Sequence, residues 1–519
     1  MKKMYLDKSR LALKRVSRNA EGSIVVPEGV ISIEKRAFVG CGYITEVSLP
    51  SSLIELREKA FEGCHSLTSI TIPEGVIKIS KRAFAECSDL KTVVLPSSLK
   101  VIDKGAFEDC SSLIHIELPE GLEIIGESAF SGCDELEAVS IPSSVTVLGK
   151  EAFSYCKRLD TIIIPEGIEH VPARCFYRSG LSHVSFPDSL TTIGDEAFEY
   201  CMMESIDISQ GVTSIGKDAF RLAGAGAAHL RIGASTQTIG VCAFWENSFQ
   251  SIEVDPANPF LTDAGCNVIM EKESGRIIFG AACSTIPNTA KAIGNGAFHS
   301  APKVLDIPGN VEIIETSAFN HIQGSTFILR EGVKTIQWSA FHELQKGNNT
   351  VYIPASVETI EGQNTSVEFH LDAGNKDYIY DAAGKNIISE NGELVWGHIG
   401  QGIPTDGVSK ISALFNINLG SDDLIVPDNV RIVDENTLRR SYGIKRVVMT
   451  KGTKTNASDS AAFCCDIKLL VPLSESSSGI TKSIEYIIPK GTPRSDIDDT
   501  LGDVSIFKWF SFSQLFKKA

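Results

Sequence analysis

The chain has 519 residues, 43% of them hydrophobic and 22% charged, and this balance excludes a disordered polypeptide. A formal net charge of −16 disfavours nucleic acid as a partner, because an acidic surface repels phosphate backbones. No apolar run approaches the length of a membrane span, and the basic segment 1–18 has no apolar core of a signal peptide. As written, the sequence favours the cytoplasm, whereas a leader missing from the given chain would make the protein secreted or surface-exposed.

Phenylalanine and cysteine recur at a fixed interval along the first half of the chain. In six consecutive repeats both residues are spaced 23 apart, which defines a core ladder of Phe38, Phe61, Phe84, Phe107, Phe130, Phe153, Cys41, Cys64, Cys87, Cys110, Cys133 and Cys156. The phenylalanine then continues at Phe176, Phe198, Phe220 and Phe244. A period in the low twenties is typical of a solenoid, whose coils bury their apolar faces only by stacking.

Each repeat predicts the same elements in the same order. In the repeat at 70–87, ITIPEGVIKISKRAFAEC, the alternation predicts a short strand with Ile70 and Ile72 inward, and Pro73 ends it. A turn follows, after which the chain returns inward and places Ala83 and Phe84 in the interior of the coil. The fold class is therefore a β-rich repeat solenoid.

These repeats resemble the leucine-rich repeats of the BspA type, whose pattern is roughly LxxIxIPxxVxxIxxxAFxxC. The match runs from about Ile24 to Phe244 and recurs at 308–319 and 331–341, whereas 427–438 departs from it. The resemblance implies a right-handed, curved superhelix with a parallel sheet on its concave side, short convex strands or turns, and a role in adhesion or protein binding. Known members are often secreted or surface-exposed.

In chain order we predict six segments. They are an N-terminal hairpin cap at 1–22, regular leucine-rich repeats at 23–250, an inserted hairpin module at 251–290, further repeats at 291–361, a second inserted hairpin module at 362–400, and degenerate repeats with a C-terminal cap at 401–519. The aromatic residues of 505–519 would cover the open end of the stack. The competing interpretation of that tail is binding to a membrane or a partner.

The cysteines of the ladder predict buried, reduced thiols that act as small hydrophobes and weak donors. The same position holds Ser179, Ala223 and Asn247 in other coils, so a nucleophile is not indicated. A metal site would need converging ligands, whereas these cysteines form a single file. Cys464 and Cys465 lie outside the ladder and have no assigned role.

Two segments interrupt the period, 253–281 and 370–398, and both resemble inserted β-hairpins. Their Asp and Asn residues suit either turn chemistry or a bound calcium ion, and turn chemistry is favoured because neither segment has the ligand spacing of a known calcium loop. We expect no cofactor and no metal.

The outward strand positions give the candidate binding face on the concave side. They are Ser48, Thr71, Val94, Glu117, Ser140, Ile163, Ser185, Asp207, Arg231 and Glu253. No aromatic residue occurs among them. His115, His183 and His229 fall in a second outward column, two or three coils apart, and are expected to be solvated.

No nucleophile elbow, phosphate loop or metalloprotease motif occurs in the sequence, so we expect a non-enzymatic protein. The favoured function is a leucine-rich-repeat scaffold for protein–protein interaction or adhesion, with a protein as the partner. The alternative is a surface protein that binds glycans or the cell wall.

Overall fold

The computed structural model describes residues 4–224, 228–320, 322, 324–342, 349–363, 367–381, 386–397 and 407–411, and five later strands between 423 and 488. The regular elements of these residues are all β-strands, and no helix among them could cross a membrane. The chain divides into two compact units, Met1–Glu273 with Ile278–Ser284, and Ser274–Ile277 with Thr285–Ala519.

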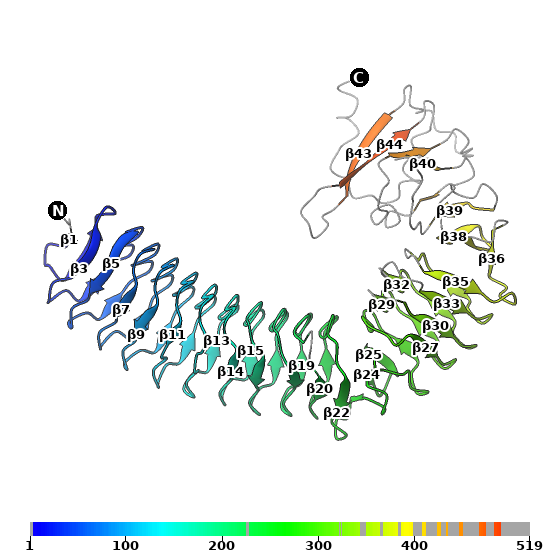
Figure 1. The fold of residues 1–519 in the computed structure, drawn as a ribbon, viewed down its shortest axis with the longest axis horizontal. Helices are drawn as coiled ribbons and strands as arrows, with labels where there is room; N and C mark the ends of the chain where they lie inside the picture. The colour runs from blue at the N-terminus through cyan, green and yellow to red at the C-terminus, as the bar shows by residue number, and fades with distance from the viewer. Residues whose placement is uncertain are drawn as a thin grey trace. The chain divides into compact units, whose positions relative to one another are not determined.

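In the first unit, each repeat forms one coil, and the coils stack side by side in a gently curved row (Figure 1). The first strand of a coil ends shortly before the proline, or before the equivalent position where Ser209, Gly233 or Asp255 replaces it, and is here called a pre-proline strand. Most of these strands pair in parallel with counterparts in the neighbouring coils. These pre-proline strands are β3 (Glu21–Val25), β5 (Tyr43–Ser48), β7 (Ser69–Thr71), β9 (Thr92–Val94), β11 (His115–Ile116), β14 (Thr161–Ile163), β16 (His183–Ser185), β18 (Ser205–Asp207), β20 (His229–Ile232) and β22 (Ser251–Val254).

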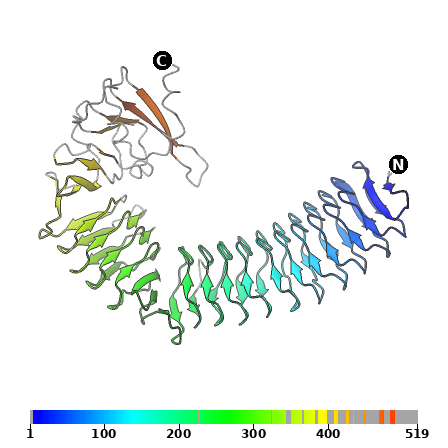
Figure 2. The same ribbon diagram turned by 180° about the vertical axis from the view of Figure 1, so that it is seen from behind.

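A second, two-residue strand follows the proline turn of each coil and pairs in parallel in the same way. This set comprises β4 (Ser32–Ile33), β6 (Glu55–Leu56), β8 (Lys78–Ile79), β10 (Val101–Ile102), β12 (Ile124–Ile125), β13 (Val147–Leu148), β15 (His170–Val171), β17 (Thr192–Ile193), β19 (Ser214–Ile215) and β21 (Thr238–Ile239). The view from behind shows the same stacking of one coil per repeat (Figure 2).

Among the described residues of the first unit, antiparallel strand pairs occur at the N-terminus and in the first interruption of the repeats. At the N-terminus, β1 (Met4–Leu6) pairs antiparallel with β2 (Ala12–Val16), and β2 joins the second strand set through β4. In the first interruption, β23 (Leu261–Thr262) pairs antiparallel with β24 (Val268–Glu271). Both pairs lie inside segments for which the sequence predicts hairpins, although the exact domain boundaries stay predictions.

The second unit repeats the two-strand coil. Its pre-proline strands are β27 (Val304–Ile307), β30 (Thr326–Leu329), β33 (Thr350–Ile353) and β35 (Glu368–Leu371), and its second strands are β26 (Ala292–Ile293), β28 (Ile313–Ile314), β31 (Thr335–Ile336) and β34 (Thr359–Ile360). Arg276 and Ile277 of β25 (Arg276–Gly280) pair with β26, and β29 (Phe319–Asn320) pairs with β32 (Phe341–His342).

The second interruption forms an antiparallel meander in the second unit. It consists of β36 (Tyr378–Tyr380), β37 (Asn386–Ser389) and β38 (Glu393–Gly397), and β38 continues in parallel to β39 (Lys410–Ile411) and β41 (Ile432–Val433). A further four-stranded sheet contains β40 (Asp423–Val426), β42 (Arg446–Met449), β43 (Ile467–Leu473) and β44 (Lys482–Ile488). The predicted cap at 505–519 and the pair Cys464–Cys465 lie outside the described residues.

A ladder of phenylalanines holds the coils of the first unit in register. The N–H of Phe61 donates to the C=O of Ala83 in the next coil at 2.7 Å, and Phe84 does the same to Ala106 at 2.8 Å. From Phe38 to Phe244 the successive rings stack with centroids 4.4–5.6 Å apart. The prediction of a β-rich repeat solenoid is therefore confirmed.

The cysteines of the ladder are buried, as the sequence predicts, and are free thiols in the structure. From Cys64 onward each points at the phenylalanine carbonyl of the preceding coil: the distance from Cys87 Sγ to Phe61 O is 3.2 Å, and from Cys110 Sγ to Phe84 O it is 3.1 Å. Cys41, in the first coil, points at Ser17 O instead, at 3.6 Å. Asn247 replaces the thiol in a later coil and donates to Phe220 O at 2.8 Å. Cysteine or asparagine at this position therefore adds a hydrogen bond between coils, whereas Ala223 shows that the coil also forms without a donor there.

The alternation of Pro-Glu-Gly and Pro-Ser-Ser turns has a structural cause that the sequence analysis did not find. The carboxylate of Glu74 accepts hydrogen bonds from the N–H and the hydroxyl of Ser97 in the next coil, both at 3.0 Å. In return, Ser98 Oγ accepts from the Gly75 N–H and donates to Val76 O, each at 3.0 Å. Glu28 and Glu166 make similar bonds to the next coil, so these exposed glutamates link neighbouring coils.

We expect Phe107→Ala to lower the free energy of unfolding by about 3–5 kcal/mol, because it removes a ring from a fully buried stack. Phe107 lies 5.4 Å from both Phe84 and Phe130, measured between ring centroids. Denaturant titration measures the change. The control is Phe260→Ala, the same substitution at a ring that is 44% exposed, and equal losses in the two variants would contradict the buried-stack explanation.

We expect native thiol labelling to reach Cys283 well before the ladder cysteines. Cys283 is exposed, whereas burial raises the pKa of Cys41 to about 12 and raises the pKa of Cys110 still further. Iodoacetamide modification at pH 8, followed by peptide mass spectrometry, resolves each site. Ladder peptides that react as fast as the Cys283 peptide in native protein would be inconsistent with a closed core, and labelling in denaturant is the control.

Candidate binding surfaces

The structure places the ten predicted face residues in one exposed row along the pre-proline strands, here called the pre-proline face. All ten side chains are exposed. The strand register pairs Thr71 with Val94, and it pairs Arg231 with both Asp207 and Glu253. The stack therefore brings together residues that are 22–24 positions apart in the sequence. The concave location of this row stays a prediction.

The pre-proline face is mixed in character. Val94 and Ile163 expose 57% and 67% of their surface. Arg231 lies 4.0 Å from Asp207 and 3.9 Å from Asp255, so its charge is only loosely balanced. The face thus offers isolated apolar side chains among hydroxyl groups and a few charges, a composition that suits contact with another macromolecule.

The three histidines of the second outward column are exposed and separate. His183 Nε2 lies 3.3 Å from Glu204, and His229 Nδ1 forms a 2.6 Å hydrogen bond with Ser251 Oγ. Throughout the described part of the chain, no three His, Cys, Asp or Glu side chains gather in a way that could hold a metal ion.

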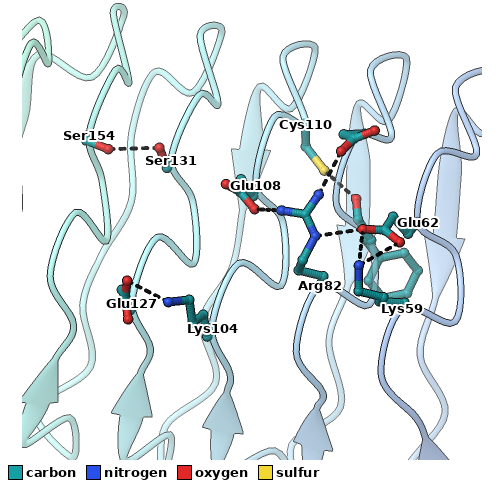
Figure 3. Close-up of polar contacts among 11 residues, drawn as sticks. Lys59, Glu62, Arg82, Lys104, Glu108, Cys110, Glu127, Ser131 and Ser154 are labelled. Atoms are coloured by element: carbon teal, nitrogen blue, oxygen red, sulfur yellow. Dashed lines mark hydrogen bonds and ion pairs between the residues drawn. The ribbon is translucent and has the colours of Figure 1, made fainter. Parts of the chain in front are cut away.

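A cluster of ion pairs lies at the turns that contain the core phenylalanines, and this row of turns is here called the turn edge (Figure 3). Arg82 contacts carboxylates of three coils: Glu62 at 2.6 Å, Glu86 at 2.7 Å, and Glu108. Lys59 Nζ adds a contact of 2.9 Å to Glu62. Arg82 exposes only 23% of its side chain, so the cluster is closed and links coils to one another.

The surroundings shift the pKa values of two carboxyl groups in this cluster in opposite directions. Burial alone would raise the pKa of Glu62, but hydrogen bonds from Lys59 and Arg82 outweigh it and hold that pKa below its ordinary value. Burial raises the pKa of Glu108, and the charge of Arg82 offsets only part of this effect. Each charge has a partner inside the cluster, which therefore serves the fold rather than a ligand.

Further along the same edge the residue types change. Here lies a tyrosine–arginine strip, which we define as Tyr155, Arg174, Tyr177, Arg178 and Tyr200. The Tyr155 and Tyr177 rings meet edge to face at 5.5 Å, and the Tyr177 and Tyr200 rings do so at 6.0 Å. The sequence analysis considered the outward strand positions and missed this strip. The sequence signal for it is the tyrosine or arginine among the two residues that follow Phe153, Phe176 and Phe198.

Glu199 lies beside the strip and is a buried carboxyl group, with 5% of its surface exposed. Burial raises its pKa to about 7, while Arg221, 3.5 Å away, lowers it and the nearby Glu196 and Asp218 raise it further. The group therefore changes charge near neutral pH.

In the two interruptions, the asparagines serve the turns. The amide nitrogen of Asn258, a fully buried residue, donates to Gly233 O and Thr236 O at 2.9 Å, and its oxygen accepts from the N–H groups of Phe260 and Leu261 at 2.8 Å. Asn375 makes the corresponding bonds in the second interruption. These bonds account for both asparagines without a bound ion.

Comparison with protein families gives a match to the model described as BspA type leucine rich repeat region (6 copies), at residues 19–120, 100–225, 191–263 and 282–367. These matches span more than half of the chain. The chain belongs to the BspA-type leucine-rich repeat family. A comparison with curated proteins gave no match.

Solved structures of bacterial leucine-rich repeat proteins are similar. A leucine-rich repeat protein from Bacteroides ovatus is 24% identical over 72% of this chain and 98% of its own, with a TM-score of 0.53, and shares the fold. A leucine rich cell surface protein from Faecalibacterium prausnitzii is 22% identical, with coverage of 72% and 94% and a TM-score of 0.39. The T. pallidum leucine-rich repeat protein is 27% identical, with coverage of 36% and 78% and a TM-score of 0.26.

We expect Glu199→Gln to reduce the loss of stability as the pH rises from 5 to 8. A carboxyl group whose pKa is raised in the folded state stabilises the fold at low pH, and that contribution is lost between its unfolded pKa, about 4.5, and about 7. The contribution is on the order of 2 kcal/mol. Denaturant midpoints at the two pH values measure it.

The control for this experiment is Glu117→Gln, at a side chain that is 90% exposed. If wild type, Glu199→Gln and Glu117→Gln all lose the same stability over this pH range, then Glu199 is not the titrating group.

Proposed function

We propose that this leucine-rich repeat scaffold binds a protein partner through the pre-proline face, in an interaction or adhesion role and without catalysing a reaction. The observation that carries the proposal is the exposed, in-register row of ten side chains. At the strand spacing of about 4.8 Å, the row is about 40 Å long, enough for an interface of ordinary size.

The backbone of this surface is fixed before any partner arrives. Parallel strand pairing holds most of these strands, as in the pairing of Ser69, Ile70 and Thr71 with Thr92, Val93 and Val94. A pre-organised surface loses little conformational entropy on binding, so modest contacts suffice for specific association. Ile163 and Val94 would supply apolar contacts, and Arg231 a polar one.

A second candidate function, glycan binding, is favoured by one site in the second unit. Tyr352, 46% exposed on β33, stacks on His370 of β35 with ring centroids 4.9 Å apart and an interplanar angle of 17°. Exposed, flat aromatic surfaces are suited to stacking against sugar rings. The pre-proline face of the first unit has no such platform.

Ile163→Asp tests the protein-binding proposal. Photo-cross-linking to proteins of the source organism, with quantitative mass spectrometry, identifies candidate partners of the wild type, and the affinity of each is then measured with purified protein. We expect Ile163→Asp to weaken the partner's binding about tenfold or more, because it places a charge in a desolvated contact. Ile77→Asp is the matched control, since Ile77 is 59% exposed and lies outside the row.

Equal binding by wild type and Ile163→Asp, or equal loss in both variants, would place the interface elsewhere. A glycan array probed with wild type and Tyr352→Ala tests the second candidate function. Glycan binding that disappears in Tyr352→Ala, without any protein partner, would replace the protein-binding proposal.

A further inference from the structure

The tyrosine–arginine strip is an addition to the repeat and not a requirement of it. The residue two positions after the core phenylalanine is Gly40, Gly63 and Gly132 in three earlier coils, and these coils stack as well as the others. In three successive later coils the same position holds Tyr155, Arg178 and Tyr200. The coil therefore folds without these side chains.

Within the strip, Arg178 is held in place by the tyrosines. Its guanidinium carbon lies 4.4 Å from the centre of the Tyr200 ring and 5.5 Å from that of Tyr177. Its Nε–H donates to the hydroxyl oxygen of Tyr177 at 3.0 Å. The two terminal nitrogens make no hydrogen bond to any of the described residues. One side of a fixed, planar cation is thus available to an acceptor.

The neighbouring arginines are already neutralised. Arg174 lies 3.5 Å from Glu151 and 3.3 Å from Glu196, and Arg221 also has two carboxylate neighbours. Arg178 is exposed and, among the described residues, has no carboxylate within ion-pair distance. The strip therefore presents one unbalanced positive charge framed by aromatic rings.

We propose that Arg178, held by Tyr177 and Tyr200 with Tyr155 packed against Tyr177, is a docking site for a carboxylate side chain of an acidic segment in a partner protein. The terminal nitrogens match the two oxygens of a carboxylate, and the rings would pack against its methylene groups and flanking residues. Arginine and tyrosine are also the residues that most often dominate protein interfaces.

The charge of the site favours a carboxylate over a phosphate. A single unpaired guanidinium balances one negative charge, whereas a dianion would also meet the carboxylates of Glu151 and Glu196 and a chain of net charge −16. The proposal rests on the proposed protein-binding function but uses a surface separate from the pre-proline face.

The test selects twelve-residue peptides from a random phage-displayed library on the wild-type protein. We expect one class of selected peptides to be enriched in Asp or Glu, with binding about tenfold or more weaker to Arg178→Gln and to Tyr200→Ala. Arg178→Lys should recover only part of the affinity, because it keeps the charge but loses the two-pronged contact. The thermal unfolding of each variant checks that the solenoid is intact.

The matched control is Arg158→Gln, which removes an exposed positive charge that is already paired with Glu135 and Glu137. Acidic peptides that bind all variants equally, or a selection without acidic enrichment, would overturn the proposal. Peptides that respond to Ile163→Asp but not to Arg178→Gln would also overturn it, while leaving the protein-binding proposal for the pre-proline face intact. Competition by inorganic phosphate stronger than by acetate would show that the site takes phosphate instead.

Discussion

The hydrogen bond from the phenylalanine N–H of one coil to the alanine C=O of the next is the constraint on which the rest of the structure depends. It sets the spacing at which the phenylalanine rings stack, and Phe84 to Ala106 at 2.8 Å is one of many such bonds. Because equivalent residues then lie directly above one another, every sequence position becomes a column. A column of thiols, a column of rings and a row of outward side chains all follow from this single register.

The repeat made most of the fold predictable from the sequence. The periodic phenylalanines and cysteines identify the buried positions, and the apolar alternation before each proline identifies the strands, so the solenoid and its core residues agree with the structure. The burial of Cys87 was predictable for the same reason, whereas its carbonyl acceptor, Phe61 O, was not. That acceptor belongs to a different coil, and a single repeat contains no information on its neighbour's backbone.

The candidate surfaces were less predictable, and the reason is again geometric. Strand positions have a two-residue alternation that separates outward from inward side chains, so the pre-proline face could be named in advance. The turns have no such alternation. The bond between Glu74 and Ser97, and the rings around Arg178, depend on which turn residues lie side by side in adjacent coils. Only the structure shows that these side chains meet.

Stacking in register also creates an electrostatic problem, because like charges in one column would lie only one coil apart. At several positions residues of opposite sign alternate: Lys35 lies beside Glu58 at 2.7 Å, and Lys157 beside Asp134 at 2.9 Å, each one repeat away. Such exposed pairs stabilise the fold little, but they prevent the repulsion that a uniform column would cause. Against this background, the positive charge of Arg178, fixed on tyrosine rings and left without a carboxylate among the described residues, differs from the paired charges of Arg174 and Arg221. Since the repeat already satisfies the requirements of folding without Arg178, the side chain is available for a contact outside the chain.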